Sequence, residues 1–243
     1  MAAMFARVLG LSAVVLSSTP GRALASGGIE GTIRLAGPAP VVAARPIAKD
    51  ANVCGGAAPI ESVIVGKGGA LANVVVSVTD ARFAGPPSPS PRAFVDQRRC
   101  RYAPHVQAVT VGTPLTIINN DAILHNVHGN EAGAGLVAPT VFNLAMPIKG
   151  QKLPVPMRKP GLIRLQCDAG HSWMNGWIYV FSHPYFAVTD DAGAFVIDGV
   201  PAGDHVVELW HEPASGQGPG TRTTATIKVV DGKRARLDLT LHL

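Results

Sequence analysis

A short segment of this sequence, CDAGHSWM, concentrates three side chains that bind soft metal ions. Cys167, His171 and Met174 offer a thiolate sulfur, an imidazole nitrogen and a thioether sulfur, with three residues between the first two and two between the last two. Sulfur and imidazole ligands together select copper over magnesium or calcium, which prefer oxygen. Zinc more often takes four ligands from Cys, His and acids, and a thioether fits it poorly. The segment therefore indicates a copper-binding loop.

A second imidazole is available upstream of this loop. A trigonal copper site of the electron-transfer kind uses two histidine nitrogens and one thiolate, with a weak axial thioether. The segment NNDAILHNVH contains His125 after an Asn-Asn turn. We therefore predict one mononuclear copper ion bound by this residue together with Cys167, His171 and Met174. His128 is a further candidate ligand, although a solvent-facing histidine fits its position as well.

Polar and aromatic residues beside the four ligands are expected to support them. Asn120 and Asn126 flank the turn that carries His125, and we expect their amides to hold the ligand loops by hydrogen bonds. Trp173 lies between two ligands and is expected to shield the site as a hydrophobic wall. His105 shares the strand parity of its apolar neighbours, which leaves open a supporting role near the site.

Strands, rather than helices, must position these side chains. The composition is 47% hydrophobic and 15% charged, with 27 Gly and 20 Pro, which favours many short strands joined by turns. PGLIRLQC at 160–167 and GWIYVFS at 176–182 are two expected strands that bracket the copper-binding segment. Alternation along LIRLQC points Cys167 inward at the end of its strand. The stretch 131–151 is expected to be a long loop.

The three cysteines are expected to divide into a pair and a free thiol. Cys54 and Cys100 lie in loop-like sequence without metal-binding neighbours, whereas Cys167 has His171 and Met174 close behind it. In an oxidising compartment two of three cysteines usually pair. We predict a Cys54–Cys100 disulfide, with Cys167 left as the metal ligand.

The N-terminal residues predict secretion. Arg7 precedes an apolar stretch at 8–16, and ALA at 23–25 fits a cleavage site near Ala25, so residues 1–25 are expected to be a signal peptide. The apolar stretch is shorter than the ~20 residues that an anchor helix needs to cross a bilayer. Its removal would lower the formal charge from +5 to +3, because Arg7 and Arg22 leave with it. We expect a periplasmic or secreted protein without a membrane span.

Two longer segments resemble the plastocyanin-like cupredoxins. These are YAPHVQAVTVGTPLTIINNDAILHNV and PGLIRLQCDAGHSWMNGWIYV, within residues 92–182. The resemblance implies a Greek-key β-sandwich with copper ligands at the four positions named above. The segments HNVH, FNLA and HPYFAVTD are similar to those of bacterial periplasmic proteins labelled methylamine utilisation proteins. The spacing of the loop departs from that of plastocyanins and matches half of a binuclear copper loop. Ile163 stands where such a loop needs its second Cys, so we expect a single ion.

The remaining sequence resembles a different β-sandwich. TDDAGAFVIDGVPAGDHVVEL is similar to the carboxypeptidase regulatory-like, transthyretin-like domains, whose opening strands resemble GGIEGTIRL and LANVVVSV near the N-terminus. The resemblance implies a sandwich made of 27–90 and 183–243, with the cupredoxin domain 92–182 inserted. The alternative is an N-terminal extension, a cupredoxin and a separate C-terminal domain. Insertion requires the strand at 29–35 to pair with strands in 184–240.

These features favour a periplasmic electron carrier. Copper would pass electrons between partner proteins such as a dehydrogenase and a cytochrome, with Cys167 in the pathway and His171 toward the surface as the exit. A copper chaperone or storage protein, or a carbohydrate- or partner-binding module, is the alternative. No catalytic residues are expected, because four ligands leave copper without an open position. The basic cluster at 98–101 is too short to indicate nucleic acid binding, and we expect a monomer.

Overall fold

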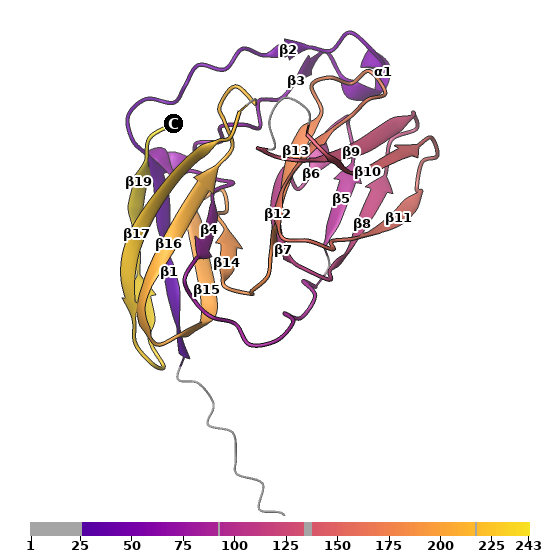
Figure 1. The fold of residues 1–243 in the computed structure, drawn as a ribbon. Helices are drawn as coiled ribbons and strands as arrows, with labels where there is room; N and C mark the ends of the chain where they lie inside the picture. Colours follow the sequence, from indigo (N-terminus) through magenta and orange to yellow (C-terminus); the bar gives the residue numbers. More distant parts are fainter. Residues whose placement is uncertain (1–25, 92, 134–137, 217) are drawn as a thin grey trace, which may run out of the picture.

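The computed structural model describes residues 26–91, 93–133, 138–216 and 218–243, and strands dominate it (Figure 1). This confirms the all-β prediction. The predicted signal peptide, residues 1–25, lies outside the described residues. Within the described part of the chain, no helix has the length and apolar character needed to cross a membrane.

The unit that carries the predicted copper ligands is a sandwich of two sheets, and we name it the copper-binding unit after that prediction. The five-stranded sheet has the order β10-β9-β12-β13-β7, and the four-stranded sheet has the order β11-β8-β5-β6. Inward side chains from both sheets form one buried cluster, so the ligands are attached to a packed core. The strands of the first sheet are β7 (Val106–Thr110), β9 (His125–Glu131), β10 (Thr140–Met146), β12 (Gly161–Gln166) and β13 (Asn175–Phe181). Those of the second are β5 (Phe94–Gln97), β6 (Tyr102–Ala103), β8 (Pro114–Asn119) and β11 (Lys152–Pro156).

The second unit is built from both ends of the chain. Its central strand β1 pairs with β15, β18 and β19, and its other sheet has the order β14-β4-β16-β17. The chain leaves this unit after β4 and returns at β14. The pairing of β1 with β15, β18 and β19 is the strand pairing that insertion requires. The proposed domain boundaries and the transthyretin-like relationship stay predictions. The strands are β1 (Ser26–Leu35), β4 (Val75–Val78), β14 (Phe186–Val188), β15 (Ala194–Pro201), β16 (Gly203–His211), β17 (Thr221–Val229), β18 (Arg234–Arg236) and β19 (Leu239–Leu241). A short 3-10 helix, η1 (Lys67–Gly69), precedes β4.

The predicted long loop at 131–151 is wrong in part, because it contains β10. This edge strand pairs antiparallel with β9 and places Met146 opposite His125. Its burial alternates, with Phe142, Leu144 and Met146 turned inward between exposed neighbours, so the segment has a strand pattern that the loop prediction overlooked. Local alternation and pairing with β9 thus both make this segment a strand.

The sequence of residues 225–243, ATIKVVDGKRARLDLTLHL, predicts a hairpin through the turn DGK, and this prediction is wrong. β17 belongs to the sheet of β16, whereas β18 pairs in parallel with β1. The turn between them therefore carries the chain from one sheet to the other. After β18 the backbone passes close to β1 at Gly31. Glycine is needed there, because a Cβ on Gly31 would lie 1.8 Å from the carbonyl oxygen of Leu237.

A segment that we call the strap, residues 45–58, crosses from the second unit to the copper-binding unit (Figure 1). It contains β2 (Arg45–Pro46), the short helix α1 (Ala51–Cys54) and β3 (Ala57–Ala58), and β2 pairs with β3. A disulfide joins Cys54 to Cys100, which confirms the predicted pairing and leaves Cys167 as the free thiol. The strap is therefore covalently attached beside the copper-binding segment.

The two units also meet in a buried joint around Trp177 and Trp210, whose ring centroids lie 5.3 Å apart. The fully buried Glu212 accepts a hydrogen bond from Trp177 Nε1 at 2.9 Å and pairs with His105 Nε2. Burial alone would lower the pKa of His105, but the hydrogen bond and charge of Glu212 outweigh it and raise this pKa. His105 thus has a role in the joint between the units.

Substitution Glu212→Gln tests this charged pair. Because the pKa of His105 is raised in the folded protein, the pair contributes fully below the unfolded pKa of about 6.5 and fades as the pH rises through the folded pKa. We expect a loss of about 3 kcal/mol of unfolding free energy near pH 6 and a smaller loss near pH 9. Urea unfolding of both proteins at pH 6 and pH 9 measures these losses of unfolding free energy. Glu208→Gln, which breaks the exposed pair with Arg222, is the control and should cost under about 1 kcal/mol. Equal losses for Glu212→Gln at both pH values would contradict the assignment.

Candidate metal centre

The strand pairing brings the histidine and the cysteine to one end of the sheet. His125 is the first residue of β9, and Cys167 directly follows the last residue of β12. Because β9 and β12 are antiparallel neighbours, the start of one lies beside the end of the other. The backbone N–H of Asn126 donates to Cys167 Sγ at 3.4 Å. His171 follows in the loop that leads from β12 into β13.

Three donor atoms converge in a buried space. The Nδ1 atoms of His125 and His171 lie 3.2 Å apart, and Cys167 Sγ lies 3.6 Å from His171 Nδ1. Ligand atoms of all three residues lie within 4.8 Å of one another. Both histidines are fully buried and the cysteine is 5% exposed. The inward direction predicted for Cys167 from strand alternation is confirmed.

Each histidine is oriented by a carboxylate behind it. His125 Nε2 lies 2.9 Å from Asp121 Oδ2, and His171 Nε2 lies 2.9 Å from Asp50 Oδ2. A carboxylate accepts hydrogen bonds, so each ring places its proton on Nε2 and leaves the lone pair of Nδ1 facing the other ring. Sequence reasoning missed both carboxylates. Asp121 is four residues before His125 and was open to detection, whereas Asp50 is 121 residues from His171 and has no local signal.

This donor set fits a metal ion. Two imidazole lone pairs and a thiol sulfur face one another, and acceptors this close repel unless a cation joins them. Burial, and the charge of His171 to a lesser degree, lower the pKa of His125 despite Asp121, which favours the neutral, ligating imidazole. Metal–nitrogen bonds of about 2.0 Å in a trigonal arrangement separate two nitrogens by about 3.5 Å, close to the observed spacing. Two imidazoles and one thiolate are the set typical of copper electron-transfer sites.

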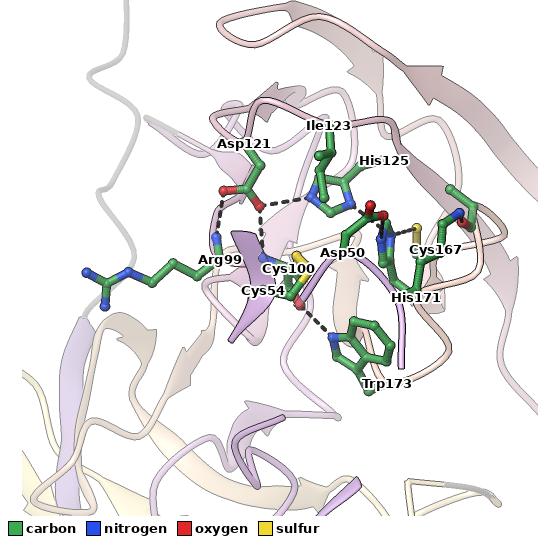
Figure 2. The surroundings of a disulfide bond; sticks show 12 residues. Asp50, Cys54, Arg99, Cys100, Asp121, Ile123, His125, Cys167, His171 and Trp173 are labelled. Atoms are coloured by element: carbon green, nitrogen blue, oxygen red, sulfur yellow. Dashed lines mark hydrogen bonds and ion pairs between the residues drawn. A yellow bond between two sulfur atoms is a disulfide. The ribbon is translucent and has the colours of Figure 1, made fainter. Parts of the chain in front are cut away.

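Asp121 is held by a strained turn (Figure 2). The backbone N–H groups of Arg99 and Cys100 donate to its Oδ1 and Oδ2, each at 2.8 Å. Both donors have left-handed backbone conformations, with φ of 51° and 54°, which cost about 1–2 kcal/mol per residue. The strained turn points two consecutive N–H groups at one carboxylate, and these bonds offset its cost.

Two buried methionines lie in the segments that carry or pair with the ligand residues. Met174, the predicted axial ligand, is 2% exposed, and its backbone N–H donates to the carbonyl of His171. Met146 is fully buried opposite His125 in the β9–β10 ladder, and its sulfur accepts a hydrogen bond from Gln97 Nε2 at 3.0 Å. Sequence reasoning missed Met146, because its strand was taken for a loop. Since Gln97 engages that sulfur, Met174 stays the axial candidate.

Asn126 ties the ligand strand to its surroundings, whereas His128 points elsewhere. The Asn126 amide donates to Asn143 Oδ1 at 2.6 Å and accepts the backbone N–H of Asp168 at 3.2 Å. His128 faces the opposite side of β9, with Nδ1 2.7 Å from Asp168 and Nε2 2.8 Å from Thr140 Oγ1. Both ring nitrogens of His128 are thus engaged away from the three converging donors.

His171 does not lie toward the surface, so its expected role as an exposed exit is wrong. It is fully buried. Trp173 packs edge-on against it at a centroid distance of 5.3 Å and donates its Nε1–H to the carbonyl of Cys100 at 3.2 Å. The strap covers it through Asp50, and Lys49 donates to the carbonyl of Ala169. Trp173 therefore forms the expected wall.

The supporting role expected of Asn120 is carried out by Asn119. The fully buried Asn119 amide donates to the carbonyls of Ile123 at 3.0 Å and Met146 at 2.7 Å, and its Oδ1 accepts the N–H of Asp121 at 3.0 Å. Asn120 is exposed, and its amide donates to a carboxylate on β5. Alternation along β8 points Asn119, its last residue, inward and the following Asn120 outward.

The two neighbouring asparagines provide a matched test of this assignment. Asn119→Ala removes three bonds inside the protein, and we expect a loss of about 3 kcal/mol of unfolding free energy. Asn120→Ala removes one exposed bond and should change stability by no more than about 0.5 kcal/mol. Urea unfolding of the metal-free proteins measures both values. A larger loss for Asn120→Ala than for Asn119→Ala would reverse the assignment.

Comparison with protein-family models gives no match, and comparison with curated proteins gives none either. Among solved structures, a reduced Cu(I) form of an amicyanin variant matches at 27% identity, covering 39% of this chain and 92% of amicyanin with a TM-score of 0.32. A purple cupredoxin from Nitrosopumilus maritimus matches at 20% identity, over 37% of this chain and 99% of its own, with a TM-score of 0.31. A copper-containing nitrite reductase from Thermus scotoductus matches at 22% identity, over 43% of this chain and 25% of its own, with a TM-score of 0.30. These similarities are partial and their TM-scores low, so the functional conclusion rests on the geometry of the centre.

Proposed function

We propose that this protein binds one copper ion through His125, Cys167 and His171, with Met174 as a fourth candidate ligand, and that it carries electrons. The convergence of two histidine Nδ1 atoms and one free thiol in a buried space supports this proposal most directly. A buried set of one soft thiolate and two imidazoles favours copper over ions that prefer oxygen ligands.

The residues around the ligands suit a centre that exchanges electrons. A bound copper ion would supply one-electron chemistry by alternating between Cu(I) and Cu(II). The chain's part is to hold the donor atoms nearly still. His125 and Cys167 belong to adjacent paired strands, and carboxylates fix both imidazole rings. The Asn126 N–H donates to Cys167 Sγ and thereby stabilises the thiolate.

The partner in this proposal is another redox protein, such as a cytochrome or a dehydrogenase, in the periplasm or outside the cell. A disulfide beside the centre fits an oxidising compartment. The secretion signal predicted at residues 1–25 supports the same location. With His171 covered, electrons would reach the partner across the residues that cover the centre rather than through an exposed imidazole edge.

A copper-holding protein is the second candidate, and one observation favours it. The two histidines are fully buried, and the free cysteine, Trp173 and Met174 are nearly so. Enclosure of this kind slows the exchange of a bound ion and restricts contact with a partner protein. Storage or delivery of copper would exploit the same ligands without a change in oxidation state.

Loading with Cu(II) tests the copper centre. We expect a stoichiometry of one ion per chain and an intense visible band from thiolate-to-copper charge transfer. Cys167→Ser should abolish the band, because no other free thiol is present in the chain. His128→Ala is the matched control and should retain both the band and the stoichiometry, because the His128 ring faces Asp168 and Thr140. A chain that binds no copper would refute the proposal.

Redox cycling separates the two candidate functions. For an electron carrier, ascorbate should bleach the band and ferricyanide should restore it through repeated cycles, with copper content unchanged by metal analysis. A rigid donor set predicts this reversibility. A protein that binds Cu(I) tightly and stays colourless with Cu(II) would instead support storage or delivery.

A further inference from the structure

The two carboxylates that bind the copper-ligand histidines each lie next to one half of the same disulfide (Figure 2). On one side, Cys54 is the last residue of α1, and Asp50 immediately precedes this helix. The backbone N–H groups of Val53 and Cys54 each donate to the carbonyl of Asp50 at 2.9 Å. One turn of helix thus connects the disulfide to the carboxylate that holds His171.

On the other side, Cys100 contacts the second carboxylate and the wall of the centre. Its N–H donates to Asp121, which accepts the Nε2–H of His125, and its carbonyl accepts from Trp173. Ligand atoms of Cys54, Cys100 and His171 lie within 4.8 Å of one another. The disulfide is therefore packed directly against the centre.

The backbone is strained where it meets the disulfide. Within the described ranges, four non-glycine residues have positive φ, and three of them are Asp50, Arg99 and Cys100. Such strain persists only where surrounding contacts hold it, and it concentrates at functional sites. The Asp50 side chain does not cap α1, although it stands at the N-cap position. It bonds to His171 instead.

Apolar packing and hydrogen bonds hold the strap in place together with the disulfide. A helix of four residues is far too short to be stable alone. Ile47 and Ala58 of the strap are buried in the hydrophobic cluster of the copper-binding unit. Hydrogen bonds also run from Arg45 to Ser215 and from Lys49 to Ala169. Between these contacts, the disulfide at Cys54 fixes the short helix that follows Asp50, so we expect the placement of Asp50 to depend on this covalent link.

We propose that Asp50 is a positioning residue for the copper centre, and that the Cys54–Cys100 disulfide sets copper affinity by holding this carboxylate on His171. The inference rests on the proposed copper centre. Loss of the carboxylate would let the His171 proton move between Nε2 and Nδ1 and let the ring rotate. Both changes remove a ligand lone pair from the centre.

Substitution Asp50→Ala tests the positioning role in a chain that keeps its disulfide. Competition for Cu(I) with a chromophoric chelator should show a 10–100-fold loss of affinity, the range found when a histidine loses its outer partner. Asp80→Ala is the matched control, because it removes the carboxylate on His205 in the other unit. It should leave Cu(I) affinity unchanged. Unchanged affinity in Asp50→Ala would overturn the proposal.

A readout without metal distinguishes this proposal from the copper function itself. In the metal-free wild type, nitrogen NMR of His171 should show the tautomer protonated at Nε2, and Asp50→Ala should give a mixture of tautomers. If the wild type bound no copper, the proposed function would fail while this tautomer test still decided the role of Asp50. An unchanged His171 signal in Asp50→Ala would refute positioning even if copper binds.

The double substitution Cys54→Ser with Cys100→Ser tests the role of the disulfide. It should lower Cu(I) affinity to a similar extent as Asp50→Ala. Combined with Asp50→Ala, it should add no more than about twofold, because both changes remove the same contact. Losses that multiply in the combined variant would show that the disulfide acts by another route. Asp50→Ala keeps the proposal testable if the serine variant does not fold.

Discussion

Two histidine–carboxylate hydrogen bonds are the interactions on which the centre depends. His125 and His171 are buried side by side, and each donates Nε2–H to an aspartate. This fixes which nitrogen of each ring carries the proton and which lone pair faces the thiol of Cys167. Much of the neighbouring structure serves these two bonds. The strained turn at Arg99 and Cys100 holds one aspartate, and the strap and its disulfide hold the other.

The sandwich supplies what these hydrogen bonds cannot, namely the approach of segments that are distant in the sequence. β9 and β12 pair, so His125 and Cys167 meet at one end of a sheet whose inner face is closely packed. Close packing resists displacement of either ligand. The second unit contributes the start of the strap and Glu212, which binds Trp177 and His105 of the copper-binding unit. The stability of the second unit and that of the copper-binding unit are therefore coupled through these contacts.

Enclosure has a consequence for how such a centre would work. Trp173 and the strap cover His171, so a partner would meet the strap rather than an imidazole edge. A buried, dry environment strengthens the electrostatic effect of nearby carboxylates on any bound cation. It also excludes competing ligands from solvent. The same cover that limits a partner's approach thus favours retention of a metal ion.

The sequence alone was enough to predict the strand-rich fold and the inward direction of Cys167, because both follow from local alternation and composition. It was also enough to predict the Cys54–Cys100 disulfide and the wall formed by Trp173, because only three cysteines are present and Trp173 lies between two ligands in the sequence. β10 escaped prediction although its residues alternate inward and outward, because the glycines and prolines on both sides of it are typical of a loop. Asn120 was chosen over Asn119 although Asn119 shares its side of β8 with Leu115 and Ile117, so alternation along the strand already favoured Asn119. Asp50 and the burial of His171 were decided by tertiary structure alone. A contact across 121 residues leaves no periodic trace in the sequence, since it arises from where the packed sheets and the disulfide place two distant segments.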